Sequence, residues 1–159
     1  MRQKRVLVGV AVLALAGVLI TAAIALGSGN RELTSPVTIR VEAVGGHSVF
    51  LPLNPNTHTA FGDQFVISGP LTKHDGRRVG HLHAECTFFD KQGVAAECTG
   101  TFFLPGGQVV ARGPVDFGVN DRTSGSVLGG NGRYRNARGQ VIFQNSTGNT
   151  EGFIFQLEP

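Results

Sequence analysis

Two histidines separated by one residue are the first candidates for chemistry. His81 and His83 would lie on the same face of a strand, a spacing at which two imidazoles can bind one metal ion. A zinc or iron site would need a third ligand, and no histidine follows His83 in the chain. The face also lies opposite the apolar residues Leu82 and Cys86. We therefore expect a solvent-facing pair and predict no metal site.

Nucleophilic and phosphate-binding motifs carry weaker signals. A Ser-His-Asp hydrolase would show a Gly-x-Ser-x-Gly elbow between a strand and a helix, and the chain has none. Residues 129–132 (GGNG) are as rich in glycine as a phosphate-binding loop, but neither the following lysine nor a helix is there. We predict a tight strand connection at this cluster and no bound cofactor.

The two cysteines flank a predicted hairpin turn at residues 90–93. A register that pairs Phe88 with Ala96 also pairs Cys86 with Cys98, so the cysteines would be cross-strand neighbours on the apolar face. Two interpretations remain open. The pair could be a disulfide, which an exported protein permits, or two buried thiols that act as small apolar side chains.

The elements that must position these residues are short strands. From Val37 onward, apolar and polar residues alternate in short segments that are separated by turn-forming Gly, Pro and Asn. Apolar residues do not recur at helical spacing. The predicted strands are residues 37–42, 61–71, 79–89, 95–104, 108–117, 122–128, 134–145 and 150–157. Residues 45–59, with Pro52 and Pro55, are predicted as a loop over one end. Because short turns join antiparallel neighbours, we predict an all-β fold, an eight-stranded antiparallel up-and-down β-barrel, rather than a two-layer sandwich.

The N-terminal residues are typical of a leader directed to a membrane. The uncharged run from Val6 to Leu26 is as long as the roughly 20 apolar residues that span a bilayer. The basic residues before it should hold that end in the cytoplasm, so the rest of the chain would be exported. Ala23-Ile24-Ala25 also fits a cleavage pattern. Residues 6–26 are therefore expected to anchor the protein in the membrane, or to be removed near Ala25 so that it is secreted.

The positive charge of the chain belongs to this leader. Of the 14 basic and 11 acidic residues, three basic and no acidic ones lie in residues 1–26, which leaves 11 of each in the remainder. An electrically neutral body argues against nucleic-acid binding, which depends on clustered Lys and Arg. The predicted organisation is a signal peptide or signal anchor at 1–26, a linker at 27–35 and a barrel domain at 36–159.

The glycine cluster continues into the most specific motif of the chain. Residues 129–139 (GGNGRYRNARG) closely resemble the segment that joins late strands in dirigent proteins and allene oxide cyclases. Matching positions precede it in the order of this superfamily, at residues 62–63, 75–76, 79–80, 86, 105–108 and 113. Residues 121–123 and 132–134 also look like those of the bacterial spirotetronate cyclases. The resemblance spans roughly residues 37–159 and implies an eight-stranded barrel with a central cavity.

The resemblance also implies a function in secondary metabolism. Dirigent proteins orient phenoxy radicals, and the cyclases hold a flexible apolar substrate in the conformation that closes a ring, which lowers the entropic part of the barrier. We therefore expect an exported barrel that binds an apolar polyketide, oxylipin or phenolic and directs its cyclisation or isomerisation without a nucleophile, metal or cofactor. The alternative is a non-catalytic ligand-binding or structural barrel that forms homo-oligomers. A cavity of a few hundred cubic ångströms, in the range of ligand pockets, would favour the catalytic barrel. A lumen filled by side chains would favour the structural barrel.

The candidate cavity residues are inward-facing phenylalanines and cysteines, with two aspartates as polar anchors. They are Asp63, Phe65, Cys86, Phe88, Cys98, Phe102, Asp121, Phe143, Phe153 and Phe155. Cys86 matches the position at which allene oxide cyclases have a pocket cysteine. Glu42 matches their first-strand glutamate in order, but alternation with Val41 predicts that it points outward. No catalytic residue is assigned from the sequence.

Overall fold

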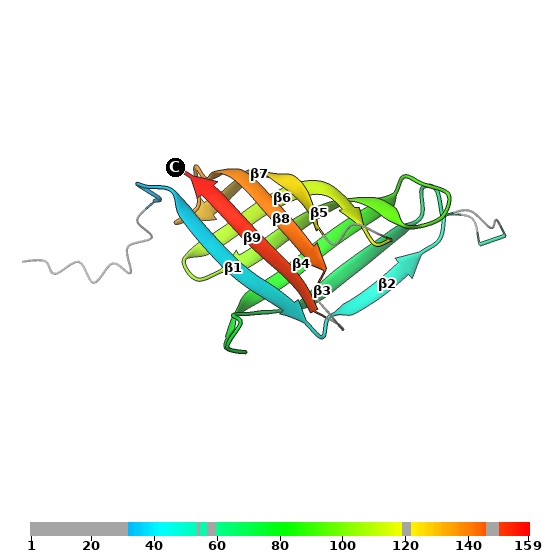
Figure 1. Ribbon diagram of the computed structural model, residues 1–159, viewed down its shortest axis with the longest axis horizontal. Helices are drawn as coiled ribbons and strands as arrows, with labels where there is room; N and C mark the ends of the chain where they lie inside the picture. Colours follow the sequence, from blue (N-terminus) through cyan, green and yellow to red (C-terminus); the bar gives the residue numbers. More distant parts are fainter. Residues whose placement is uncertain (1–31, 54, 57–59, 119–121, 146–149) are drawn as a thin grey trace, which may run out of the picture.

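The computed structural model describes residues 32–53, 55–56, 60–118, 122–145 and 150–159. The strands in these residues are β1 (Val37–Val44), β2 (His47–Leu51), β3 (Gln64–Thr72), β4 (Arg78–Phe88), β5 (Ala95–Leu104), β6 (Gly107–Asp116), β7 (Arg122–Gly132), β8 (Arg138–Asn145) and β9 (Thr150–Glu158). Neighbours along the chain pair antiparallel from β3 to β9, and β1 joins β9 to β3 and closes the sheet (Figure 1). The predicted all-β, eight-stranded antiparallel barrel is confirmed.

The predicted leader lies outside the described residues. Among the residues that the structure does describe, none forms a helix long and apolar enough to cross a membrane. Leu33, in the predicted linker, is buried in the barrel core, and its N–H donates to the carbonyl oxygen of Arg133 at 3.1 Å. The folded domain therefore takes up at least one residue of the segment predicted to connect it to the leader.

β1 and β2 together occupy one of the eight positions around the barrel. β1 pairs with the end of β3 through Ala43 and Leu71, and β2 pairs with the start of β3 through Leu51 and Gln64. Gly45, between the two strands, has a φ of 63°, which favours glycine and interrupts the strand. The prediction of a loop over 45–59 is therefore wrong for β2, whose short alternating segment lies among glycine and proline residues.

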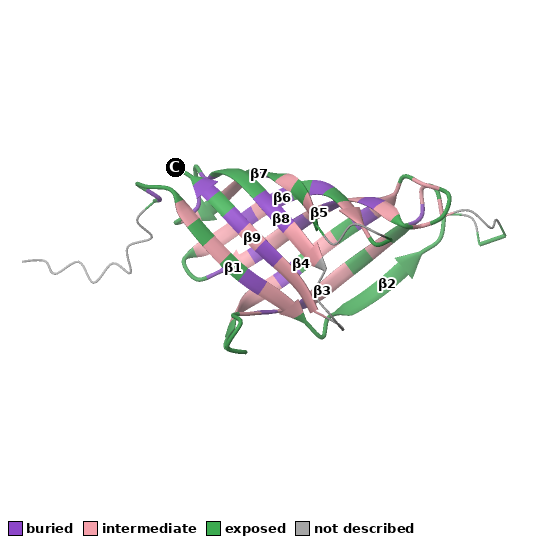
Figure 2. Ribbon diagram, viewed as in Figure 1, coloured by how far each residue is buried: buried purple, intermediate pink, exposed green. Residues whose placement is uncertain are grey.

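The interior of the barrel contains two apolar clusters. The larger is built around side chains from most strands, among them Leu82, Phe102 and Phe155, each no more than 2% exposed. The smaller consists of Cys86, Ala96 and Cys98 with partly buried neighbours, where β4 ends and β5 begins. We call this end of the barrel the disulfide end. The buried residues alternate along the strands with exposed or half-buried ones, as expected when one face of each strand lines the lumen (Figure 2).

The glycine-rich motif is divided between a strand and a turn. The prediction of a tight connection at residues 129–132 is wrong, because these residues form the end of β7 and pair with β6, and residues 133–137 make the connection to β8. A Cβ on Gly130 would lie 2.2 Å from the carbonyl oxygen of Gln108, so only glycine fits against the neighbouring strand there. The predicted strand 134–145 starts later, because Tyr134 lies in the turn, where its N–H donates to the carbonyl oxygen of Asn131. Its hydroxyl donates to the carbonyl oxygen of Pro105 at 3.1 Å, and burial raises the pKa of Tyr134.

Candidate active site in the barrel lumen

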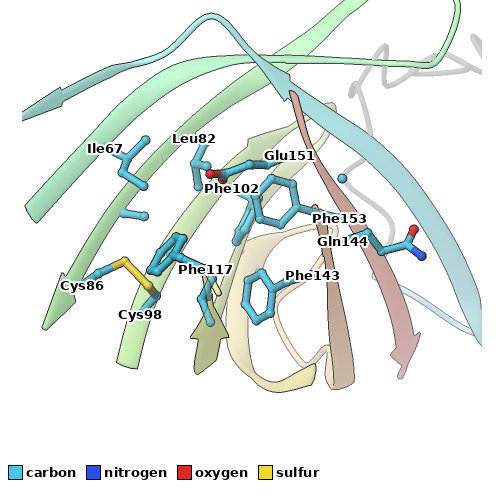
Figure 3. Close-up of a pocket in the computed structure, with 14 residues that line it drawn as sticks. Ile67, Leu82, Cys86, Cys98, Phe102, Phe117, Phe143, Gln144, Glu151 and Phe153 are labelled. Atoms are coloured by element: carbon cyan, nitrogen blue, oxygen red, sulfur yellow. A yellow bond between two sulfur atoms is a disulfide. The ribbon is translucent and has the colours of Figure 1, made fainter. Parts of the chain in front are cut away.

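A small cavity lies between the two apolar clusters. Its volume is about 30 Å³, room for about two water molecules. Residues from β3 to β6, β8 and β9 line it, together with Phe117 just after β6: Ile67, Leu82, Ala84, Cys86, Cys98, Gly100, Phe102, Val115, Phe117, Phe143, Gln144, Glu151, Gly152 and Phe153 (Figure 3). We call it the luminal cavity. Its walls are mainly apolar, so a polar group within them has a strong effect on any bound molecule.

Glu151 supplies such a group. Among the described residues that line the luminal cavity, it is the one that is ionisable. Glu151, Phe153 and Phe155 alternate along β9, which turns all three side chains inward. Figure 3 shows the carboxylate of Glu151 pointing into the cavity, whereas the amide of Gln144 points away from it.

The environment of Glu151 favours its protonated form. Burial removes water from the carboxylate and raises the pKa of Glu151 above its ordinary value. No hydrogen bond or ion pair to this carboxylate occurs among the described residues, so nothing there offsets the loss of water. Such a carboxyl group can hold a proton at a pH where exposed carboxyl groups have lost theirs, as a general acid must.

The sequence analysis missed Glu151, although the chain contains a signal for it. Residues 150–157 are predicted as a strand, and Glu151 is an even number of positions from the apolar residues Phe153 and Phe155. An acidic residue in phase with the apolar face of a barrel strand is expected to point into the lumen.

The two cysteines form a disulfide on the wall of the luminal cavity. Cys86 and Cys98 are bonded through their sulfur atoms, and their Cα atoms are 4.1 Å apart. β4 and β5 pair in the predicted register, with Phe88 opposite Ala96. The bridge covalently links two neighbouring strands beside the cavity, so it restricts how far this part of the wall can open.

Removing this bridge is expected to lower the free energy of unfolding by roughly 3 kcal/mol. The bridge joins residues 12 positions apart and so reduces the conformational entropy of the unfolded chain, and its removal restores that entropy. The double substitution Cys86→Ala, Cys98→Ala and chemical reduction of the native chain should have similar effects in urea denaturation. The double variant under reducing conditions is the control and should not change further. Two titratable thiols in the unreduced native protein would contradict the assignment.

A second hollow opens to solvent at the disulfide end. Its volume is about 270 Å³, and its lining is mostly aromatic: Ser48, Phe50, Phe65, Phe88, Gly93 and Phe117. The ring centroids of Phe65 and Phe88 are 5.2 Å apart, and those of Phe65 and Phe117 are 5.6 Å apart. We call it the phenylalanine hollow. It contains Phe65 and Phe88 from the predicted set, which therefore line the hollow and not the luminal cavity.

The other predicted residues lie in several places. Phe102, Phe143 and Phe153 are on the wall of the luminal cavity, as are the two cysteines. Phe155 is fully buried in the larger cluster, with its ring centroid 4.7 Å from that of Phe102. Asp63 is buried outside the lining, where its Oδ1 accepts a hydrogen bond from the N–H of Leu53 at 2.7 Å.

Two acidic residues from the sequence analysis remain to be placed. Asp121 lies outside the described residues. Glu42 points outward as predicted, and its Oε1 lies 3.1 Å from Nδ1 of the exposed His74. Glu42 therefore has no place among the lining residues of the luminal cavity.

The paired histidines lie on the outer face of the barrel, where their rings contact each other with centroids 4.7 Å apart. Nε2 of His81 is 3.0 Å from the hydroxyl of Ser68, and His81 is half-buried rather than freely solvated. Burial lowers the pKa of His81, and the charges of His83 and Arg78 lower it further. Over the described part of the chain, no group of three or more His, Cys, Asp or Glu side chains is placed to hold a metal ion.

Comparison with known proteins identifies the fold. A pyocyanin demethylase is 22% identical with a TM-score of 0.65, over 77% of this chain and 100% of that chain. The pterocarpan synthase dirigent protein GePTS1 is 18% identical with a TM-score of 0.60, over 79% and 84%. The exo-specific intermolecular Diels-Alderase AbnU is 17% identical with a TM-score of 0.56, over 77% and 98%. This chain has the dirigent-like barrel fold. No protein-family model and no curated protein sequence matches it.

The dirigent-like barrel is confirmed as the fold that the glycine-rich motif indicated. At these identities the likeness carries the fold, and the chemistry must be argued from the lumen of this chain. As far as the described residues go, that lumen combines apolar walls, a disulfide and one inward carboxyl group. Such an arrangement can select one conformation of an apolar molecule and can move one proton to or from it.

Proposed function

We propose that this dirigent-like barrel binds an apolar small molecule at its disulfide end and promotes its cyclisation or isomerisation. Its walls would hold the reacting conformation, and Glu151 would donate or accept the proton that the rearrangement moves. The observation that carries the proposal is the Glu151 carboxyl group, half-buried without a hydrogen-bond partner among the described residues and directed into the luminal cavity. A structural core would gain stability from an apolar residue at this position, because burial of an unpaired carboxyl group has a free-energy cost.

The physical chemistry of the site supports this combination. Selecting one conformer of a flexible molecule removes part of the entropy cost of ring closure. A carboxyl group with a raised pKa keeps its proton to a higher pH than an exposed carboxyl group does, and this one is not neutralised by a counter-ion among the described residues. Dirigent and Diels-Alderase proteins of the same fold are consistent with chemistry of this class.

We further propose that the barrel acts outside the cytoplasm. Residues 6–26 would direct export and either anchor the barrel in the membrane or be removed near Ala25. The Cys86–Cys98 bridge supports the proposal, since structural disulfides persist in oxidising compartments.

One observation favours a second candidate, a barrel that has no ligand in its lumen. The luminal cavity of about 30 Å³ is too small for an organic substrate in the present conformation. A non-catalytic structural barrel would require no larger space. The two functions differ in whether a small molecule ever occupies the lumen.

Native mass spectrometry of the full-length chain tests the proposed function. The protein is purified from its producing cells, and again after incubation with extracts that contain polyketides, oxylipins and phenolics. We expect one small molecule to remain bound, and we expect Ala84→Leu, which adds bulk to the cavity wall, to lose it. His83→Leu, on the adjacent outward-facing residue, is the matched control and should retain it. Absence of any bound molecule, or equal retention by Ala84→Leu, would support the structural barrel.

A further inference from the structure

Phe117 lies between the two spaces at the disulfide end. Among the described residues, it is the one that lines both the luminal cavity and the phenylalanine hollow. The luminal cavity contains Glu151 and measures about 30 Å³, whereas the hollow is open to solvent and measures about 270 Å³. A molecule that enters from the hollow must therefore pass the ring of Phe117 to approach Glu151.

The backbone of Phe117 is held while its ring is comparatively free. Its N–H donates to the carbonyl oxygen of Val94 at 2.7 Å, which holds the main chain just after β6. The side chain remains 38% exposed and contacts Phe65 and Phe88, with ring centroids 5.6 and 6.1 Å away. Side chains with this degree of exposure change rotamer on a fast timescale, without movement of the strands.

The rest of the wall between the two spaces is more rigid. The Cys86–Cys98 bridge links β4 to β5, and Val115 belongs to β6, where it is paired with Ala96. Phe117 lies one residue beyond the end of β6, where the hydrogen bond from its N–H to Val94 holds its backbone and leaves its ring outside the paired strand. Among these lining residues, the ring of Phe117 can therefore move with the least disturbance of the barrel.

We propose that Phe117 is the gating and size-determining residue of the luminal site. When its ring swings aside, the phenylalanine hollow and the luminal cavity join into one site that reaches Glu151. This inference rests on the proposed function, which it deepens, because it explains how so small a luminal cavity would admit a substrate. The joined site fits an elongated molecule that has an apolar ring among Phe50, Phe65 and Phe88 and one polar atom at the Glu151 carboxyl group.

The closed position reduces the apparent affinity for any ligand that needs the open one. A ligand that binds only the open form has its affinity lowered by the fraction of molecules that are open. Removing the ring removes this penalty and leaves an apolar space, and apolar cavities of this kind bind small aromatic molecules. The size of residue 117 should therefore control access to Glu151 from the hollow.

Carbon NMR on the full-length protein tests the gate, with toluene as the probe. Glutamate labelled at its carboxyl carbon reports on Glu151, whose signal is assigned by its loss in Glu151→Gln. In Phe117→Ala, we expect toluene to shift this signal at concentrations about tenfold lower than in the native protein. In Phe117→Trp, the larger ring should raise the required concentration. Phe89→Ala is the matched control, because this exposed phenylalanine of the same end lines neither space.

The proposed gate would be overturned if the same toluene concentration shifted the Glu151 signal in the native protein, in Phe117→Ala and in Phe89→Ala. If Phe117→Ala does not fold, Phe117→Trp is the deciding variant. A toluene concentration for the Glu151 shift that is unchanged or lower in Phe117→Trp would also overturn the gate. The outcome is separable from the proposed function. Toluene reaching Glu151 in Phe117→Ala, with no small molecule retained or converted by the native chain, would uphold the gate and reject the proposed function. Turnover by the native chain with unchanged toluene access would do the reverse.

Discussion

Replacing Glu151 with glutamine is expected to lower turnover of the barrel's substrate by about 100-fold or more, the contribution that a positioned general acid or base makes. The substitution preserves the shape of the side chain and removes only its ability to exchange a proton. The walls that select the substrate conformation remain, so the Michaelis constant should change much less than the rate constant. The measurement is steady-state kinetics on the molecule recovered by native mass spectrometry.

The pH dependence of turnover distinguishes a proton-transfer role from a structural one. The raised pKa of Glu151 keeps the group protonated to a higher pH than an exposed carboxyl group. If the protonated form acts as the acid, activity is present below this raised pKa and falls as the pH rises through it. The residual activity of Glu151→Gln should lack this decline. Glu42→Gln is the matched control, since Glu42 is paired with Gly152 on β9 but points outward.

Stability provides an independent readout of the same substitution. Because the pKa of Glu151 is higher in the folded than in the unfolded chain, the unfolded chain loses this proton first as the pH rises. The folded protein therefore loses stability as the pH rises from the pKa of this group in the unfolded chain to its raised pKa in the folded chain. Glu151→Gln should remove this loss. A variant that retains full activity, or that is less stable than the native chain at neutral pH, would contradict the assigned environment and role.

Replacing Phe102 with alanine is expected to lower the free energy of unfolding by about 3–5 kcal/mol, the range for removal of a fully buried phenylalanine ring. Phe102 is 1% exposed, and its ring centroid lies 5.0 Å from that of Phe153 and 4.7 Å from that of Phe155. The loss combines buried apolar area with a cavity that rigid neighbouring strands cannot fill. Urea denaturation of the native and variant proteins measures it.

The adjacent residue is a direct control for Phe102. Phe103 lies next to it on β5 but faces outward, where its ring contacts that of His83. Phe103→Ala should cost about 1 kcal/mol, typical of a substitution outside a core. Similar losses for the two variants would mean that Phe102 is not tightly packed in the interior of the barrel.

Much of the barrel could be predicted because its determinants are local. The alternation of side chains along a strand follows from backbone geometry, so the outward direction of Glu42 could be derived from Val41 alone. A short turn determines the register of a hairpin, so a turn at residues 90–93 predicted the pairing of Cys86 with Cys98, although it left a disulfide and two free thiols both open. The glycine-rich motif could be identified from the sequence because the barrel requires glycine at position 130, where a side chain has no space. The same alternation would also have placed Glu151 inside the barrel.

The sequence alone thus determined the strands other than β2, their antiparallel order and most of the inward face. Only the tertiary structure decided how deep each inward residue lies and how much space is left between them. Phe65 and Phe88 line the outer hollow while Phe102 lines the luminal cavity, and Phe117 separates the two spaces. The physical reason is that a strand's direction depends on its own backbone, whereas depth and cavity volume depend on how all the strands are staggered when the sheet closes.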